Sequence, residues 1–387
     1  MVGLPHLSTL LAGVVLVLAA PVVDKRDLVV PGKYIVTLKP GFSVAEATTH
    51  LNWVRSVHAR RGVSSRDVTG IEKVYSLSDF HAYAGSFDAS TLDEIRTNYQ
   101  VAAIEPDMIW TLDSSLVTQS PSPWNLASLS HRTPNHTTYF YHPLAGANTF
   151  AYVIDSGIRT THSEFAPARA VLGYNAIPGS SSTDHLSHGT HVAATIAGRT
   201  YGVAKLASVV AVKVFDRSLA STTSVVMDGY AWAVNNITAT PGRAARSVVS
   251  LSLGGPVSAA FNGLVAKAYE AGVVTVVSAG NEGVEAAGRS PASAGEAITV
   301  GAVDGGNGRP GWSNFGGAVD LFAPGVGVVS AWATGDGDVM EMEGTSMAAP
   351  HAAGVWEGVK GLATKEVVKD GGQGSPNLLA FNGAGEI

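Results

Sequence analysis

From residue 150 onward, short runs of β-branched and apolar residues alternate with longer segments that have helical spacing. The strand-like runs are 150–154, 208–214, 247–253, 273–278 and 297–303, and the helical segments are 188–197, 221–236 and 259–271. Apolar strands joined by helical crossovers indicate a parallel sheet that is covered on both faces. We therefore predict an α/β domain with a doubly wound, mostly parallel sheet and helices on both faces. In such a sheet, functional side chains lie at the carboxyl ends of the strands.

The chain before this domain predicts a separate, smaller α+β domain at about 32–110. Its strand-like runs are 34–38, 71–75, 82–87 and 101–110, and its helical segments are 45–60 and 90–99. Residues 114–123 are rich in serine and proline, which is typical of an exposed linker. We therefore divide the chain into residues 1–20, 21–115 and 116–387.

Residues 1–20 predict a secretory signal peptide. The apolar run 7–20 is short for a bilayer span and ends in Leu18-Ala19-Ala20, the small residues that signal peptidase requires. A buried strand or helix is the alternative, but polar residues follow at once and favour a cleaved signal. No later segment has the length of a transmembrane helix.

The composition excludes several classes of function. The net charge is -6 and no run of Lys and Arg could follow a phosphate backbone, so nucleic acid is an unsuitable partner. Cysteine is absent, which excludes disulfides, thiolate catalysis and cysteine-ligated zinc. With 45% hydrophobic and 14% charged residues, the chain can bury a sizeable core.

The candidate nucleophile is Ser346, which lies among small residues at the predicted start of a helix. Gly344 allows a tight turn, and Pro350 predicts a first-turn position. The positive end of the helix dipole would lie beneath the serine. Serine alone is inert near neutral pH, so it needs a base and a site for the oxyanion.

Three polar residues could supply these groups. Asp155 directly follows the strand 150–154, His188 opens a helical segment, and Asn281 ends another strand, where its amide could donate to an oxyanion. Each also has an ordinary interpretation: a turn aspartate, a capping histidine or one of a metal-binding pair with His191, and a turn asparagine. The metal pair is disfavoured because the glutamate of the HExxH pattern is missing. All the candidates, with Ser346, fall on one predicted edge of the sheet.

In combination these motifs resemble the subtilisin-family serine proteases, closest to the fungal proteinase K-like branch, and the order Asp, His, Ser agrees with it. The motifs are 34–38, 151–157, 188–191, 250–255, 279–281, 344–348 and 374–380. The resemblance implies a catalytic triad of Asp155, His188 and Ser346. It also implies that the Asn281 side chain and the Ser346 backbone N–H hold the oxyanion.

The same resemblance implies how a substrate would bind. Ser252, Leu253 and Gly254 would belong to the edge strand whose backbone pairs with an extended peptide. Ala279 and Gly280 would line the primary specificity pocket opposite that strand. Because these residues are small and no buried charge is expected there, we predict broad specificity with an apolar preference. The expected partners are proteins and peptides, and no membrane after the signal is removed.

The resemblance also implies that residues 21–115 are a pro-region whose inhibitor-like domain acts on the chain's own protease domain. Maturation would cut near residues 114–116 and release an extracellular monomer. The chemistry would need no cofactor. A structural calcium ion would be bound by the carbonyls of Gly295 and Ala297 and the Asp320 carboxylate, although an ion-free loop is the alternative. Asn135 and Asn236 match the glycosylation acceptor pattern.

The chain departs from the family pattern at three single positions and in one segment. Ser187 and Ala194 replace glycines, and Glu343 replaces a small residue. We expect the change at Ser187 to be mild. After Ser346, the segment 356–361 interrupts the apolar run, and several helical turns of the family are missing. Glu357 and Lys360 in this segment cannot enter an apolar core unpaired.

Two rival functions therefore remain beside an active protease. The shortened segment is either a misplaced splice junction in the gene model or a real loss, and a real loss would make the first rival, an impaired homologue that acts as a binding or inhibitory module. A lipase-like serine hydrolase is the second rival. It is disfavoured because the residues around Ser346 lack the second glycine of the G-x-S-x-G pattern.

Overall fold

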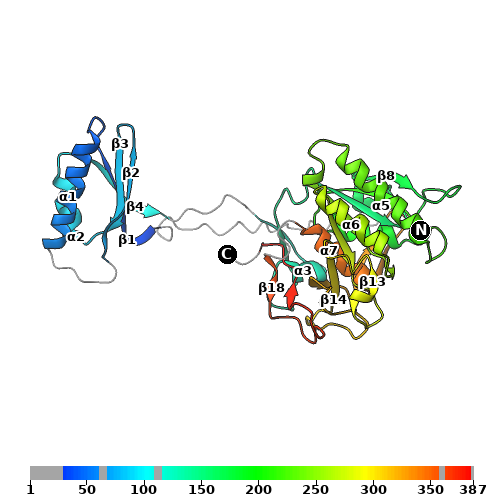
Figure 1. Ribbon diagram of the computed structural model, residues 1–387. Coiled ribbons are helices and arrows are strands. Elements are labelled where there is room, and N and C mark those ends of the chain that lie inside the picture. Colours follow the sequence, from blue (N-terminus) through cyan, green and yellow to red (C-terminus); the bar gives the residue numbers. More distant parts are fainter. Residues whose placement is uncertain (1–28, 61–67, 109–115, 357–361, 385–387) are drawn as a thin grey trace, which may run out of the picture. The chain divides into compact units, whose positions relative to one another are not determined.

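The computed structural model describes residues 29–60, 68–108, 116–356 and 362–384 (Figure 1). The chain forms two compact units, Met1–Asp113 and Ser114–Ile387. Among the described residues, no helix combines the length and the apolar character that crossing a membrane demands. The proposed signal at residues 1–20, the region cut at maturation up to residue 115, and the segment 357–361 lie outside the described residues.

The first unit is a four-stranded antiparallel sheet with two helices on one face (Figure 1). Its elements are β1 (Val29–Leu38), α1 (Val44–Arg60), β2 (Gly70–Leu77), β3 (Phe80–Ser86), α2 (Ala89–Thr97) and β4 (Val101–Met108), and the strand order is β2-β3-β1-β4. Val36 of β1, Val54 of α1 and Ile95 of α2 share one core. The predicted small α+β domain is confirmed.

The second unit is built on a nine-stranded sheet of order β18-β19-β15-β14-β12-β10-β7-β9-β8. The strands are β7 (Phe150–Asp155), β8 (Ala170–Asn175), β9 (Ser208–Lys213), β10 (Ser247–Leu251), β12 (Val274–Ser278), β14 (Ile298–Val303), β15 (Leu321–Pro324), β18 (Thr364–Lys365) and β19 (Leu378–Leu379). All neighbours pair in parallel except β18 with β19. The predicted doubly wound sheet is confirmed.

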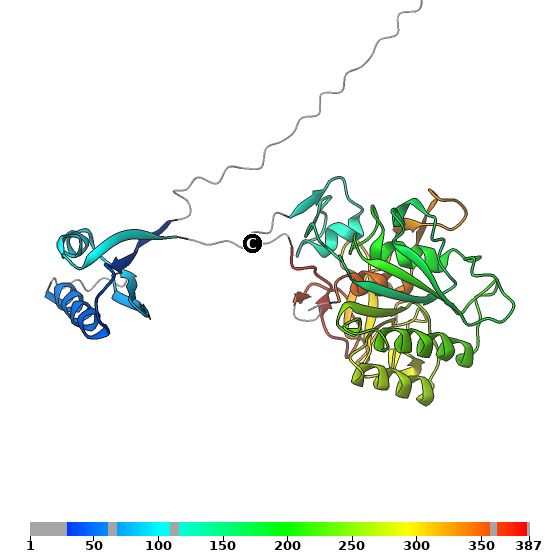
Figure 2. The same ribbon diagram turned by 90° about the horizontal axis from the view of Figure 1, so that it is seen from above.

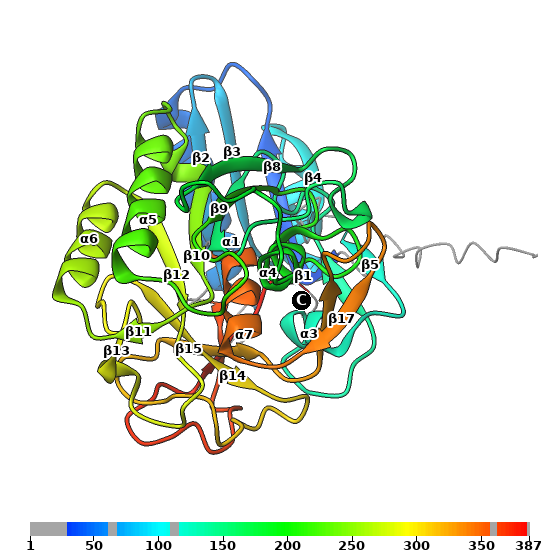
Figure 3. The same cartoon turned by 90° about the vertical axis from the view of Figure 1, so that its right-hand side faces the viewer.

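Helices cover both faces of this sheet (Figure 3). The helices are α3 (Trp124–Leu129), α4 (His188–Ala197), α5 (Thr223–Thr238), α6 (Ala259–Glu270) and α7 (Thr345–Gly354). Ala151 and Val153 of β7 pack into the core that holds α4 and α7, whereas Tyr152 and Ile154 pack into the core of α5 and α6. This alternation follows from the two-residue repeat of a strand. Figure 2 shows the green α5 and the yellow-green α6 side by side.

Smaller elements complete the second unit. They are β5 (Val117–Gln119), β6 (Tyr139–Tyr141), β11 (Gly255–Pro256), β13 (Arg289–Ser290), β16 (Val328–Ala331), β17 (Val339–Met342) and the 3-10 turns Ser163–Phe165, Ala244–Arg246 and Ala286–Gly288. They pair as β5 with β6, β11 with β13 and β16 with β17.

Pro350 lies at the sixth residue of α7, so the prediction of a first-turn position is wrong. A proline there cannot donate to the carbonyl of Ser346 four residues earlier. That carbonyl instead accepts a hydrogen bond from Ser252 Oγ at 2.7 Å. A side chain from another segment thus satisfies the carbonyl that the proline leaves without its helical donor.

Candidate active site

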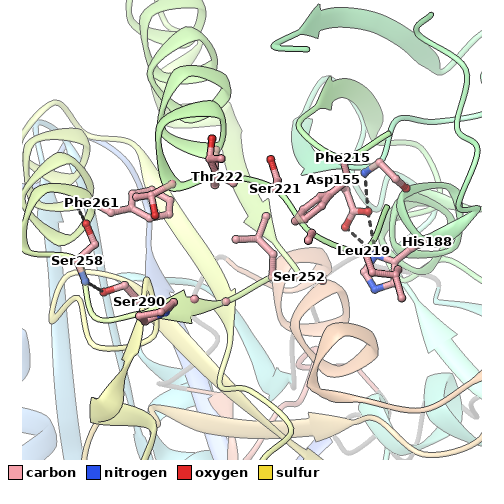
Figure 4. A pocket seen from close by; sticks show the side chains of 18 of the residues that line it. Asp155, His188, Phe215, Leu219, Ser221, Thr222, Ser252, Ser258, Phe261 and Ser290 are labelled. Carbon is pink, nitrogen blue, oxygen red and sulfur yellow. Dashed lines mark hydrogen bonds and ion pairs between the residues drawn. The ribbon is translucent and has the colours of Figure 1, made fainter. Parts of the chain in front are cut away.

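Asp155 and His188 meet at the carboxyl edge of the sheet, where β7 ends and α4 begins (Figure 4). His188 Nδ1 lies 2.8 Å from Asp155 Oδ1 and 2.9 Å from Oδ2. Asp155 is 2% exposed, and its Oδ1 also accepts from the N–H of Ser156 at 2.7 Å. The buried carboxylate therefore fixes the histidine with Nδ1 as a donor, which leaves the lone pair on Nε2.

The buried side chain of Asp184 organises the start of α4. Its Oδ1 accepts from Ser156 Oγ at 2.8 Å and from the N–H of Ser187 at 2.8 Å, and its Oδ2 accepts from the N–H and the hydroxyl of Thr190 at 2.9 Å and 2.6 Å. Sequence reasoning missed this residue. An aspartate just before a helical segment is a capping signal that could have identified it.

Ser187 precedes α4 with a φ of 63°, in the left-handed region. A residue with a Cβ pays about 1–2 kcal/mol there, and glycine does not. The replacement of the family's glycine by Ser187 is therefore less mild than the sequence suggested. Ala194, in contrast, is fully buried within α4 and packs in the shared core with α7.

The two histidines of α4 have opposite electrostatic surroundings. Burial lowers the pKa of His188, but the charge and the hydrogen bond of Asp155 outweigh burial, with help from Asp184, and the net pKa is raised. Burial lowers the pKa of His191 to about 4. His191 Nε2 lies 3.1 Å from the carbonyls of Val328 and Met340, so it donates to the backbone. The alternative of a metal-binding His188–His191 pair is therefore not supported.

Ser346 lies in the first turn of α7 and faces Ser252. Ser346 Oγ donates to the Ser252 carbonyl at 3.1 Å, while Ser252 Oγ donates to the Ser346 carbonyl. These reciprocal bonds join the start of α7 to the residue after β10. In this conformation the serine hydroxyl is directed to Ser252, and its bond to His188 is not formed among the described contacts.

Asn281 is held by the residue that precedes Ser346. Its Oδ1 accepts from the N–H of Thr345 at 2.9 Å and from the Thr345 hydroxyl at 2.8 Å. Thr345 Oγ1 in turn accepts from the N–H of Gly280 at 3.1 Å. Because both donors of Thr345 bind the amide oxygen, the Nδ2 donor of Asn281 points away from Thr345. It lies beside Gly344, whose φ is 145°.

A cavity of about 410 Å³ opens beside these residues (Figure 4). Its lining includes Asp155 and His188 together with Ser252, Leu253 and Gly254, and the apolar part is supplied by Leu186, Phe215, Leu219, Val226 and Phe261. Ala279 and Gly280 are not part of this lining. An Arg289–Glu282 ion pair at 2.9 Å, with both side chains partly exposed, lies near Gly254 and Gly280.

Comparisons with known proteins agree with this geometry. Residues 146–364 match the family model described as the subtilase family, and residues 33–113 match that of peptidase inhibitor I9. The chain is 51% identical to the subtilisin-like proteinase Mp1 of Magnaporthiopsis poae, and the match covers 99% of both chains. It is 45% identical to the alkaline proteinase of Hapsidospora chrysogena, over the full length of both. The chain belongs to the subtilase family.

A solved structure is also similar to this subtilase. The structure described as a cold adapted subtilisin-like serine proteinase matches with a TM-score of 0.63 and 36% identity, over 68% of this chain and 99% of that one. The protein is therefore a subtilisin-like serine endopeptidase preceded by an inhibitor-type pro-region, and the lipase hypothesis is excluded.

The alignment of this subtilase with Mp1 contains gaps. It spans 407 positions, which exceeds the 387 residues of this chain by 20, so at least 20 positions are gaps in this chain. The sequence predicts a shortened segment after α7. Residues 357–361, which carry Glu357 and Lys360, lie outside the described residues.

Asp320 lies directly before β15, next to the turn that carries Gly295 and Ala297. Its Oδ2 accepts from the N–H of Thr299 at 2.8 Å, which orients the carboxylate toward the start of β14. Carboxylate and carbonyl oxygens are suitable ligands for calcium. Within the described residues no cluster of three His, Asp or Glu side chains occurs, so a cation here would depend on backbone carbonyls.

The two glycosylation acceptors lie at the surface in different settings. Asn135 is exposed in a loop with a φ of 72°. Asn236 is exposed on α5, but its Oδ1 accepts from Tyr152 Oη at 2.6 Å. Of the two, Asn135 is the one that lies in a loop.

Proposed function

We propose that this protein is synthesised with a signal and a pro-region and acts as a secreted serine endopeptidase of broad specificity with an apolar preference. The observation that carries the proposal is the pairing of buried Asp155 with partly exposed His188, in a cleft large enough for peptide side chains. The lining of the same cleft includes Ser252, to whose carbonyl Ser346 Oγ donates. Aspartate, histidine and serine at the start of a helix are the groups that acyl transfer by a serine needs.

The mechanism assigns one role to each group. Ser346 Oγ leaves the Ser252 carbonyl by rotation about one side-chain bond, donates to His188 Nε2 and attacks the substrate carbonyl. His188 takes the proton and returns it to the leaving amine, while Asp155 holds the tautomer and stabilises the imidazolium. Water then attacks the acyl-enzyme in the same way, with His188 as the base, and the second product is released.

The oxyanion of the tetrahedral intermediate would be held by two donors. One is Asn281 Nδ2. The N–H and the hydroxyl of Thr345 both donate to Asn281 Oδ1, which directs the amide NH₂ group away from Thr345. The other is the N–H of Ser346, since the first N–H groups of a helix have no intrahelical acceptor. Donors fixed in advance stabilise the developing charge without reorganisation.

The apolar preference is supported by the 410 Å³ cavity. Leu219, Val226 and Phe261 supply apolar surface beside the Ser252–Gly254 segment. An extended peptide paired with that segment places alternate side chains toward the cavity. Burial of an aliphatic or aromatic side chain there contributes roughly 25 cal/mol per Å² of apolar area.

We include three further properties in this proposal. The pro-region 21–115 would act as an intramolecular inhibitor, and cutting near 114–116 would release a monomeric enzyme. A calcium ion held by Gly295, Ala297 and Asp320 would stabilise the 295–299 turn, and chelation should then lower the melting temperature; an unchanged melting temperature would contradict it. Glycosylation at Asn135 or Asn236 would accompany secretion.

The experiment is active-site labelling of the matured protein with a serine-directed fluorophosphonate, together with casein hydrolysis. We expect labelling at Ser346 and loss of both signals in Ser346→Ala. Absence of labelling in a folded wild-type protein would favour the impaired homologue that acts as a binding or inhibitory module. In a peptide panel, equal cleavage after Arg and after Leu or Phe would contradict the apolar preference.

A further inference from the structure

The loop that leads into α4 is folded around one buried carboxylate. The side chain is that of Asp184, which is 5% exposed. It accepts five hydrogen bonds of 2.6 to 3.1 Å, from the hydroxyls of Ser156 and Thr190 and from the N–H groups of Leu186, Ser187 and Thr190. A buried carboxylate requires such donors, and here the donors come from three segments of the chain. Asp184 therefore fixes these segments relative to one another.

Ser187, the residue before His188, has a backbone conformation that it would not favour by itself. Its φ is 63°, in the left-handed region, where a residue with a Cβ is strained and glycine is not. The Ser187 side chain makes no capping bond, but its N–H donates to Asp184 Oδ1 at 2.8 Å. Strain of this kind persists only where the surrounding structure imposes it. The bonds of Asp184 therefore hold the direction in which the chain enters α4.

The same network reaches the end of the strand that carries Asp155. Ser156 Oγ donates to Asp184 and accepts from the N–H of Gly189 at 2.9 Å. A Cβ on Gly189 would overlap the carbonyl of Gly157, so the first turn of α4 packs directly on the chain that follows β7. The aspartate and the histidine of the candidate pair are thus each next in sequence to residues of this network.

A buried lysine joins the two segments as well. Lys213 is 1% exposed and stands opposite the last residue of β7 in the register of β9. Its ammonium donates to the carbonyls of Ser156 at 2.8 Å and Thr183 at 3.0 Å, and lies 3.4 Å from Asp216. Ser156 and Thr183 belong to the two segments that Asp184 joins, so the distance between these segments is fixed twice.

We propose that Asp184 is a positioning residue for the base His188: it holds Ser187 in the left-handed conformation and thereby aims the imidazole at Asp155. This inference rests on the proposed function, because that function makes His188 the base. Asp184 touches neither the substrate nor the reacting atoms. A displacement of the base by about 1 Å can lower the rate about 100-fold. The loss of Asp184 should therefore slow the chemical step more than it weakens substrate binding.

The charge of Asp184 provides a second readout that a purely structural role would not change. Burial lowers the pKa of His188, whereas the charge and the hydrogen bond of Asp155 and the charge of Asp184 raise it. Of the other groups nearby, Lys213 is held by backbone carbonyls, and His191 is neutral because burial lowers its pKa to about 4. Asp184→Asn removes one of the two charges that raise the pKa of His188, so this pKa should fall.

The test is a double-mutant cycle of the matured enzyme, assayed with one internally quenched peptide over a range of pH. The cycle consists of wild type, Asp184→Asn, Ser187→Gly and the double variant. The control, Asp228→Asn, makes the same change in an exposed aspartate of α5 that accepts a hydrogen bond from Tyr174. Fluorophosphonate labelling of Ser346 counts the intact active sites, so kcat is expressed per folded enzyme.

We expect Asp184→Asn to lower kcat about 100-fold while KM stays within about twofold of wild type. With Ser187→Gly already present, the same change should lower kcat only about tenfold, because glycine adopts the left-handed conformation without help. The acid limb of kcat/KM should move to lower pH in Asp184→Asn, whereas loss of the fold in acid would move it to higher pH. Asp228→Asn should change neither kcat nor the acid limb.

A second variant keeps the test informative if Asp184→Asn proves unable to fold. Thr190→Val has nearly the shape of threonine, keeps the charge of Asp184 and removes one of the five donors. It should lower kcat by a smaller factor than Asp184→Asn, and Ser187→Gly should again reduce the loss. The acid limb should stay in place, because the charge is still there.

Three results would overturn the inference. The first is a folded Asp184→Asn enzyme whose kcat stays within about twofold of wild type. The second is a loss of kcat that is as large with Ser187→Gly as without it. The third is an acid limb that stays in place or moves to higher pH in Asp184→Asn. A wild-type protein that neither labels nor cleaves would overturn the proposed function itself, and this inference with it.

Discussion

His351, at the seventh residue of α7, is expected to make the second unit sensitive to acid. It is fully buried, and burial lowers its pKa to about 4, with a further contribution from His191. Its Nδ1 donates to the Met347 carbonyl at 2.7 Å, and its Nε2 accepts from Asn125 Nδ2 at 2.8 Å. A second proton on the ring would give Nε2 an N–H that points at the NH₂ group of Asn125, which is also a donor. Only the neutral ring accepts the bond from Asn125, so the fold requires the neutral form.

The size of the effect follows from the two pKa values. The unfolded chain binds a proton at His351 near pH 6.5 and the folded chain near pH 4, so the unfolded state binds more protons between these values. The free energy of unfolding therefore falls as the pH drops below 6.5, and the full loss is reached below pH 4. At pH 5 the loss is about 2 kcal/mol relative to pH 7.5.

The assay compares Ser346→Ala with Ser346→Ala/His351→Gln, because an inactive background prevents self-digestion. Urea unfolding is followed at pH 7.5 and pH 5.0 by pulsed hydrogen exchange of peptides that cover α7. We expect the drop in unfolding free energy between the two pH values to be about 2 kcal/mol smaller with His351→Gln. The contribution of His191 is present in both proteins and cancels.

The matched control is His142→Gln, since His142 is exposed and lies in a loop. It should leave the pH-dependent drop unchanged. If His351→Gln loses as much stability on acidification as its parent, the buried neutral histidine is not a source of acid sensitivity, and the reasoning from burial and from the Asn125 bond is refuted.

Three further predictions concern the site. Asn281→Ala should lower kcat by about 100- to 1000-fold with little change in KM in peptide hydrolysis, and a loss confined to KM would contradict its role with the oxyanion. The raised pKa of His188 should place the acid limb of kcat/KM above pH 6.5, because the base must be neutral, and a limb below that value would disagree. Ser187→Gly should raise the urea midpoint, equivalent to about 1 kcal/mol, since it relieves the left-handed φ; a lower midpoint would show that the serine is not strained.

Five of the nine strands and three helices of the second unit were predicted from the sequence, whereas β8, β15, β18 and β19 were not. The run 273–278 became β12 at Val274–Ser278, and the segment 188–197 became α4 at His188–Ala197. These elements are local: apolar continuity or helical spacing is visible in a short window. Asp155 and Asn281 could be placed at one edge for the same reason, because the end of a strand can be read from the end of its apolar run.

The contacts that tune the site could not be predicted in this way. Asn314 and Glu282 are 32 positions apart, and Asn125 and His351 are 226 apart. A single polar residue within a loop has no periodicity, so its partner is known only from the folded chain. The Arg289–Glu282 ion pair was missed for this reason, and so was the role of Thr345 in orienting Asn281.

The structure also bears on whether a short helix can hold the nucleophile. α7 has 10 residues, and its positioning contacts are concentrated in the first two turns: Thr345 with Asn281, Ser346 with Ser252, and His351 with Asn125. Near its end, a pocket of about 400 Å³ lies beside Ala353 and Gly354. If a shortened chain loses contacts at that end, the free energy of unfolding falls, because dispersion and hydrophobic burial are lost. The contacts of the first two turns do not depend on that end, so we expect shortening after Gly354 to affect the stability of the enzyme more than the position of Ser346.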